Sequence, residues 1–358
     1  MWVDALIIFA KALIFLNAVL ILTALLTWME RKQSAVMQDR IGANRATIFG
    51  VRAIGLFHIA ADALKMFFKE DYVPRGADRV LHTIAPFAAL FFALMSFAAI
   101  PFGSSIRIAG RDIALVVLPL NVGLLFVFAM MSMGIYGTFL AGFSSNNKYA
   151  FLGGLRASSQ MISYEITMGA TLVGLLMTFG TLDLMELNRA QGELLWGWLP
   201  KWGIVLQPLG FLLFLTAGVA ETKRVPFDLP EGESEIIGYF VEYSSMKFGA
   251  FFMTDFIETI LIASLLTTLF FGGWQVPYLQ ADGFHFPGGL AWTLHPWAVV
   301  LLQTAAFGIK VVFFCWLLLL IRWTLPRFRY DQLMHLGWKI LLPISILNIF
   351  LTALLLLK

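Results

Sequence analysis

Six carboxylates fall within one short stretch of an otherwise apolar chain, the segment 221–243 with the sequence ETKRVPFDLPEGESEIIGYFVEY. Only two basic residues, Lys223 and Arg224, lie among them. Carboxylates that are close together and partly removed from water cannot all ionise at neutral pH, so they titrate as a coupled set. Such a set can store and pass protons, and we interpret the stretch as a proton relay. Its acidic residues are Glu221, Asp228, Glu231, Glu233, Glu235 and Glu242.

The prolines of this stretch predict that one helix stops and another begins. Pro226 and Pro230 lack an amide proton and disfavour a helix in the residue before them. Beyond Pro230 we expect a new segment in which Glu231, Glu235 and Glu242 share one helix face. The alternative is a solvated acidic loop that the two basic residues hold in order.

Four further ionisable side chains fall inside or at the ends of apolar runs, where a charge is costly and usually functional. We expect Glu165 and Asp255 to lie near the acidic stretch and to extend the relay into the membrane. Lys310 has no charged neighbour in sequence, so its partner must come from another helix. The four residues are Glu165, Asp255, Glu258 and Lys310.

The elements that must position these groups are membrane-spanning helices. The chain has 358 residues, of which 59% are apolar and 13% are charged, with a mean hydropathy of +0.82. This composition excludes a soluble globular domain. We predict an all-α polytopic membrane protein, a single integral membrane domain over 1–358 with eight transmembrane helices. The predicted spans are 5–28, 80–102, 113–140, 161–182, 203–220, 248–272, 297–323 and 338–357.

The distribution of Lys and Arg predicts how these helices are oriented. The odd-numbered loops carry seventeen of these residues and the even-numbered loops carry four. Because positively charged loops remain in the cytoplasm, loop 1 (about 30–78) and loop 5 (about 221–247) are predicted to form the cytoplasmic face. Both termini are then on the outer side of the membrane.

Loop 1 contains a predicted amphipathic helix that lies at the membrane surface. In GLFHIAADALKMFFKED, polar residues recur at helical spacing and apolar residues fill the other faces. Arg40 and Asp62 bracket this helix. We expect this pair to orient a polar head group whose tail stays in the lipid.

Electron transfer would need a partner, because the sequence contains no redox centre that we can identify. A single cysteine, Cys315, cannot hold an iron–sulfur cluster, and the five histidines lie in loops or near the ends of apolar runs. Neither G-x-G-x-x-G nor a P-loop is present. We therefore expect no cofactor bound by this chain alone and no nucleic-acid partner.

Several motifs together resemble one family, the H subunit (chain 1 in mitochondria) of respiratory complex I, the proton-pumping NADH:quinone oxidoreductase. The longest match is AETKRVPFDLPEGESEIIGYFVEYSSMKF at 220–248, and the resemblance covers almost the whole chain. The other matching motifs are ERK at 30–32, QDRIGANR at 38–45, ADALKMFFKED at 61–71, SYE at 163–165 and RFRYDQL at 327–333.

The resemblance implies a subunit of the bacterial inner membrane that joins the membrane arm to the peripheral arm and lines the quinone chamber. Quinone is the substrate, and an iron–sulfur cluster in a partner subunit supplies the electrons. Further implied partners are the quinone-site subunits and the small membrane subunits that lead to the antiporter-like subunits. By position, Arg40, Asp62 and Lys65 match the chamber or its entrance. Glu165 and the six acids of the 221–243 stretch match an acidic funnel.

This sequence also departs from the family pattern. Ser132 stands where many relatives have a glutamate, Asp255 replaces a usual glutamate, and His58 with Ile59 replaces a usual Gln-Pro. Two alternatives therefore remain in view. One is the equivalent anchor subunit of a membrane-bound hydrogenase or an F420H2 dehydrogenase. The other is a stand-alone ion transporter, against which the absence of an internal repeat counts.

Overall fold

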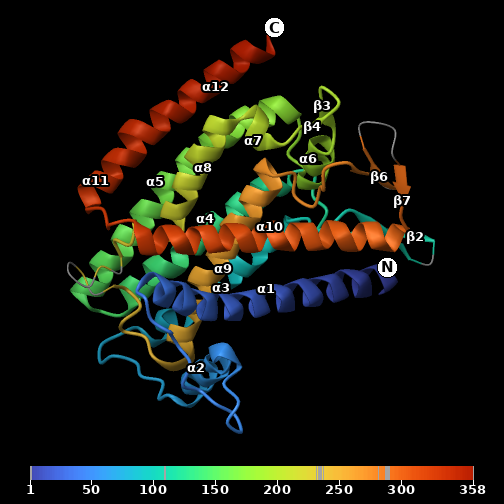
Figure 1. Ribbon diagram of the computed structural model, residues 1–358. Helices are drawn as coiled ribbons and strands as arrows, with labels where there is room; N and C mark the ends of the chain where they lie inside the picture. The colour runs from blue at the N-terminus through green and yellow to red at the C-terminus, as the bar shows by residue number, and fades with distance from the viewer. Residues whose placement is uncertain are drawn as a thin grey trace.

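Helices make up most of the chain, as the computed structural model in Figure 1 shows. It describes residues 2–108, 110–230, 232, 236, 238–280, 282–286 and 291–357. The long helices are α1 (Trp2–Met37), α3 (Arg79–Ser96), α4 (Gly123–Ser144), α5 (Lys148–Phe179), α9 (Ser245–Phe270) and α10 (Pro296–Thr324). The shorter helices are α2 (Phe57–Phe68), α6 (Leu184–Gln191), α7 (Gly203–Leu206), α8 (Pro208–Glu221), α11 (Tyr330–His335) and α12 (Leu342–Leu356). Two 3₁₀ turns, Ala53–Gly55 and Phe97–Ala99, and the π-helical segment Leu336–Leu341 complete the helical elements.

Seven helices in the described part of the chain are long and apolar enough to cross a bilayer. They are α1, α3 with its 3₁₀ extension, α4, α5, α9, α10 and the continuous run Tyr330–Leu356. A polytopic helical membrane protein is therefore confirmed. The predicted fifth span, 203–220, is interrupted and leaves α8 with 14 residues.

The interruption between α7 and α8 has a local cause. Proline at 208 disfavours helical geometry in the residue before it, and Gln207 has φ −135° and ψ 60°. At this break the Gln207 side chain donates to Thr352 Oγ1 at 2.7 Å and accepts from Asn348 Nδ2 at 3.0 Å. The break therefore attaches this segment to α12.

Two predicted boundaries are wrong. The span expected at 113–140 begins only at Gly123, because residues 111–114 pair with 105–108 in a hairpin. The span expected at 161–182 begins much earlier, at Lys148, where the Asn147 side chain caps the helix by accepting from Tyr149 N. The first half of α5 contains polar residues, so an apolar run does not predict it as part of a span. These polar residues face neighbouring helices rather than lipid.

The all-α prediction also misses short strands in the connections between helices. β1 (Ser105–Ile108) pairs with β2 (Arg111–Ala114), and β3 (Leu194–Leu195) pairs with β4 (Leu199–Pro200), both antiparallel. A third antiparallel sheet has the order β5 (Leu279–Gln280), β6 (Gly283–His285), β7 (Ala291–Thr293). Arg111 of β2 forms an ion pair with Asp4 of α1 at 3.0 Å, so the first hairpin lies beside the N-terminal end of α1.

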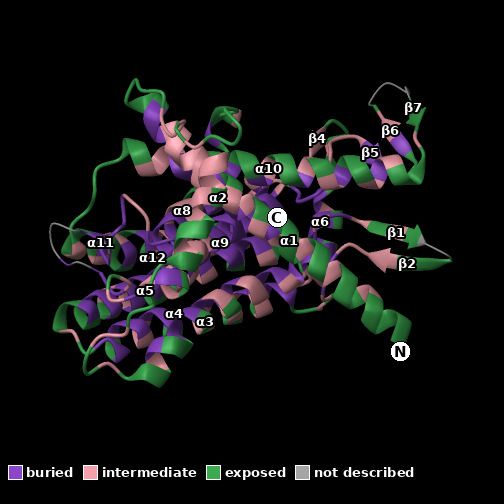
Figure 2. Cartoon of the chain, turned by 90° about the horizontal axis from the view of Figure 1, so that it is seen from below, coloured by how far each residue is buried: buried purple, intermediate pink, exposed green. Residues whose placement is uncertain are grey.

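Helix α9 lies at the centre of the bundle and contacts α1, α2, α3, α8 and α10. Figure 2 shows buried residues concentrated around α9 and exposed residues along the N-terminal part of α1. Of the seven candidate spans, α9 is the most buried and α1 the least. Polar groups on α9 are therefore screened from lipid, whereas most of α1 presents apolar side chains outward.

Helices α3 and α4 approach closely because Gly137 faces Ala89. A Cβ at position 137 would lie 2.7 Å from both the Cβ and the backbone nitrogen of Ala89. Small residues allow membrane helices to pack backbone against backbone. The pair therefore sets the distance between these two helices.

Replacing Gly137 by alanine is expected to destabilise the protein by about 1–3 kcal/mol, since the added methyl group has to separate α3 from α4. Gly169→Ala on α5 is the matched control, because a Cβ there meets nothing within 4 Å. Thermal unfolding of the detergent-solubilised complex would measure both. Equal midpoints for the two variants would contradict close packing at Gly137.

Candidate functional site

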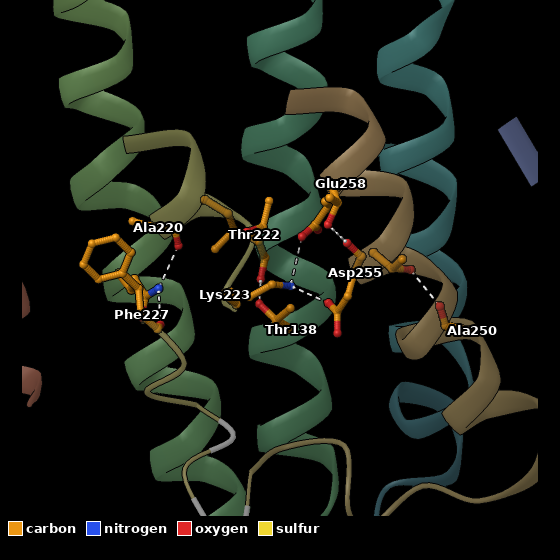
Figure 3. Close-up of polar contacts among 12 residues, drawn as sticks. Thr138, Ala220, Thr222, Lys223, Phe227, Ala250, Asp255 and Glu258 are labelled. Carbon is orange, nitrogen blue, oxygen red and sulfur yellow. Dashed lines mark hydrogen bonds and ion pairs between the residues drawn. The ribbon is translucent and has the colours of Figure 1, made fainter. Parts of the chain in front are cut away.

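The most deeply buried ion cluster joins the turn after α8 to one face of α9. Lys223 Nζ lies 3.3 Å from Asp255 Oδ1 and 3.3 Å from Glu258 Oε2 (Figure 3). The lysine side chain is 3% exposed, and the two acidic side chains are 14% and 13% exposed. Asp255 and Glu258 are three residues apart, so they lie one turn apart on the same face of α9. We call these three residues the Lys223 triad.

The Lys223 ammonium remains charged despite its burial. Burial alone lowers the pKa of a lysine, but here Glu258, Tyr239 and Asp255 more than offset it and raise the pKa of Lys223 well above its usual value. The backbone at Lys223 is left-handed, with φ 53°. Gln160 of α5 donates to Ala220 O at 2.7 Å and to Phe227 O at 2.8 Å, and so holds both ends of this turn.

Two more acids, Glu221 and Glu165, lie beyond the triad. Glu221, at the end of α8, is 2% exposed, and its Oε2 has no hydrogen-bond partner among the described residues. Glu221 and Glu258 both line a small internal cavity of about 10 Å³, roughly the space of one water molecule. Glu165 of α5 accepts a hydrogen bond from the Ser132 hydroxyl of α4. Ser132 thus contacts a predicted relay acid directly.

On the other side of the triad, Glu30 of α1 pairs with two arginines. Arg224 Nη1 lies 3.1 Å from Glu30 Oε2, and Arg322 of α10 contacts the other carboxylate oxygen. These three side chains and Asp255 line a cavity of about 200 Å³ together with Phe240, Phe248, Phe251 and Phe252. We call it the Glu30 cavity.

A wider groove opens beside it between α1, α2 and α9. It has a volume of about 660 Å³, and Phe248 and Phe252 line both it and the Glu30 cavity. Its polar lining includes Asp62, which forms an ion pair with Arg31 at 2.5 Å, and Lys65. We call it the α2 groove. It combines aromatic walls with a few charged groups, which is the usual lining of a site for a largely apolar ligand.

Arg40 and Asp62, the two residues expected to orient a polar head group, line two neighbouring cavities. Asp62 contacts Arg31, while Arg40 Nε donates to Gln38 Oε1 at 2.7 Å. Arg40 lines a separate neighbouring cavity of about 430 Å³, and Arg31 lines both. His58, one of the departures from the family pattern, also lines the Arg40 cavity and accepts from the backbone nitrogens of residues 45 and 46.

The remaining acids of the 221–243 stretch have other partners. Asp228 forms an ion pair with Arg327 at 2.8 Å, and Glu242 accepts from Asn147 Nδ2 at 2.6 Å. The expectation that Glu242 shares a helix face is wrong, because residues 239–244 form bends and turns and α9 starts at Ser245. Gly238, with φ 100°, breaks the helical geometry just before them. Glu231, Glu233 and Glu235 lie outside the described residues.

Lys310 finds its partners outside its own helix, as expected, and they are three backbone carbonyls and the ring of Trp202, whose centroid lies 4.8 Å from the ammonium. Its ammonium donates to Phe271 O, Gly273 O and Gln275 O at 2.8, 3.0 and 2.7 Å. These carbonyls follow the C-terminus of α9, where the helix dipole favours a positive charge. Lys310 therefore holds the end of α9 and does not join the acidic cluster.

Sequence reasoning missed several members of the site. Glu30 and Arg31 were interpretable as an ordinary interfacial anchor, and Glu258 carried no motif beyond its position in an apolar run. A helical projection of α9 would have placed Glu258 beside Asp255. Their common partner could not be found that way, since Lys223 comes from another segment. Among the described residues, no group of three or more His, Cys, Asp or Glu side chains is placed to hold a metal ion.

Comparison with known proteins identifies the family of the chain. The model of the NADH dehydrogenase family matches residues 10–353. The chain is 42% identical over 357 residues to the H subunit of the NADH-quinone oxidoreductase of Thermomicrobium roseum, covering 99% of this chain and 97% of that protein. It is 44% identical to an H subunit of the Cytophaga hutchinsonii enzyme, with 91% and 90% covered, and 44% identical to an H subunit of the Geobacter sulfurreducens enzyme, with 96% and 94% covered. With a family match over almost its full length, the chain belongs to the NADH dehydrogenase family.

Proposed function

We propose that this chain is the H subunit of a proton-translocating NADH:quinone oxidoreductase. The observation that carries the proposal is the α2 groove and its connection, through shared aromatic walls, to buried carboxylates. The relatives named as H subunits of NADH-quinone oxidoreductase support it over a hydrogenase anchor, an F420H2 dehydrogenase anchor or a stand-alone transporter.

In this proposal, quinone enters the α2 groove from the bilayer with its tail along Phe248 and Phe252. The Arg31–Asp62 pair and Lys65 face the polar head, and Arg40 extends this polar lining into the neighbouring cavity. Reduction of a quinone takes two electrons and two protons. The carboxylates of this chain transfer protons but not electrons. The electrons therefore come from an iron–sulfur cluster in a partner subunit.

The proton path of this proposal runs from the Glu30 cavity through Asp255 and Glu258 to Glu221 and Glu165. Asp228 and Glu242 stand beside its entrance, together with Glu231, Glu233 and Glu235. A change of charge in the α2 groove is felt along this path because few water molecules screen buried groups. Quinone reduction thereby alters the proton occupancy of the acids, which is how it is coupled to translocation.

The placement in the cell follows from the same proposal. The chain is an inner-membrane subunit with both termini on the outer side, eight membrane crossings including α8, and α2 at the cytoplasmic surface. Its partners are the peripheral-arm subunits over the α2 groove and the small membrane subunits toward the antiporter-like subunits.

The test replaces Asp62 by asparagine in the assembled complex. Removing one member of the partly exposed Arg31–Asp62 pair leaves a positive charge unbalanced beside the quinone head. We expect it to raise the KM for short-chain quinones about tenfold, equivalent to a loss of about 1.4 kcal/mol of binding free energy. NADH:quinone reductase assays on native membranes measure the KM.

The matched control is Asp112→Asn, which breaks an exposed pair with Arg107 in the β1–β2 hairpin. It should leave the KM unchanged, because exposed ion pairs contribute little. If the Asp62→Asn variant had the same KM as the control, the proposal that quinone binds in the α2 groove would be wrong.

A further inference from the structure

Lys223 places a positive charge within the proposed proton path, where the other ionisable groups are carboxylates. A path of carboxylates does not by itself require a lysine. Its side chain is 3% exposed and lies 3.3 Å from one oxygen of Asp255 and 3.3 Å from one oxygen of Glu258. A buried ammonium needs one carboxylate to balance it. The Lys223 triad has two, so it carries a net charge of minus one when all three groups are ionised. Such a triad readily accepts one proton.

The two acids of the triad face different spaces. Asp255 lines the Glu30 cavity, whereas Glu258 lines the small internal cavity with Glu221. Lys223 contacts both acids (Figure 3) and so connects a lining residue of one cavity with a lining residue of the other. It comes from the turn after α8, which Gln160 holds through two carbonyls. The cation is therefore supplied by a segment that α5, and not α9 alone, holds in place.

We propose that Lys223 is a positioning residue that makes the proton occupancies of Asp255 and Glu258 interdependent, so that the triad passes one proton at a time between the two cavities. This inference rests on the proposed function, since it assigns a role within that relay. In the step itself, an O–H bond of protonated Asp255 breaks and an O–H bond on Glu258 forms. The aspartate regains its negative charge and the glutamate loses its own, and no electrons are transferred.

The surroundings make Lys223 the main balancing charge for these two acids. Arg224 also acts on Glu258, but it is already paired with Glu30. Tyr239, from the segment before α9, is a further titratable group that acts on Lys223. Arg322 lines the Glu30 cavity with Asp255 and, like Arg224, is paired with Glu30. The other charged groups near the triad are Glu221 at the end of α8 and, acting on Glu221, Glu165 of α5. Without Lys223, the acids would therefore repel one another with little compensation.

Two substitutions in the assembled complex test the proposal by moving the pH profile of proton pumping in opposite directions. In Lys223→Met the acids lose their cation and hold protons more tightly, so the optimum shifts to higher pH by about one unit or more. Glu258→Gln removes a proton carrier, so the pumping rate falls. The ammonium then acts on Asp255 alone, which releases its proton more easily, so the optimum of the remaining pumping shifts to lower pH. The pumping rate of Lys223→Met is expected to fall at least about tenfold, as on loss of a proton-transfer partner.

Rescue distinguishes charge coupling from packing. Lys223→Arg keeps the charge and should retain most of the pumping, whereas Lys223→Met, which keeps only the length of the side chain, should not. Lys201→Met, at an exposed pair with Glu193, is the control for loss of a lysine and should match the wild type. Native gels report whether each complex has assembled.

Shifts in the same direction, or no shift in either variant, would overturn the inference. If the Lys223→Met complex does not assemble, the Glu258→Gln variant alone decides. An unchanged pH profile in that variant would overturn the inference, and a shift to lower pH would support it. The wild-type complex separates this result from the proposed function. Absence of quinone-dependent pumping in the wild type would refute the function, whereas wild-type pumping with unmoved variants refutes only the role of Lys223.

Discussion

Replacing Glu221 by glutamine is expected to lower quinone-dependent proton pumping about 100-fold or more, the scale on which a positioned proton donor or acceptor acts. Glu221 is 2% exposed, it lines the internal cavity with Glu258, and it makes no ion pair with a described residue. Glutamine keeps the shape of the side chain but cannot carry the proton. Because no ion pair is lost, we expect the complex to assemble normally.

Pumping is measured as quinone-dependent acidification in membrane vesicles, with NADH oxidation followed in parallel. Glu186→Gln provides the control, because Glu186 is an exposed residue of α6 that accepts only from the Thr181 hydroxyl at 2.6 Å. Normal pumping by an assembled Glu221→Gln complex would exclude Glu221 from the relay.

Replacing Glu30 by glutamine is expected to destabilise the chain by about 3–5 kcal/mol, since removing one partner of a buried ion pair leaves the other charge uncompensated. Glu30 is 14% exposed and contacts Arg224, which is 10% exposed, and Arg322. It thereby joins α1, the turn after α8 and α10. Loss of both ion pairs should lower the unfolding midpoint of the complex and loosen α1.

The comparison variant is Glu193→Gln, whose partner is Lys201 and whose side chain is 68% exposed. It should change stability by less than about 0.5 kcal/mol, as surface substitutions usually do. Thermal unfolding in detergent measures both variants. If Glu30→Gln were as stable as Glu193→Gln, the two arginines would have to be balanced by other groups.

The helix boundaries show which parts of the fold can be predicted from local sequence. Length and apolarity placed the cores of α3, α9 and α10 closely, because a helix in lipid has to be long and continuously apolar. The same criterion failed for α5, whose first half carries polar residues that face other helices. It failed again at Gln207, where Pro208 interrupts an apolar run without changing its hydropathy.

The acidic residues show the same division. Their concentration in 221–243, and the cost of charges at Asp255 and Glu165, were visible in the sequence since both are properties of composition along the chain. The choice of partners was not visible. Asp62 pairs with Arg31 rather than Arg40, and Asp228 pairs with Arg327, about a hundred residues away.

The sequence by itself therefore determined that this chain is a multi-pass helical membrane protein with a costly group of carboxylates, and its motifs indicated the family to which it belongs. Only the tertiary structure decided which acids meet a cation, which line a cavity and which are left unpaired. The physical reason is that hydrophobicity acts along each helix separately, whereas ion pairs form between helices. Lys223, Asp255 and Glu258 become one unit only when the turn after α8 packs against α9.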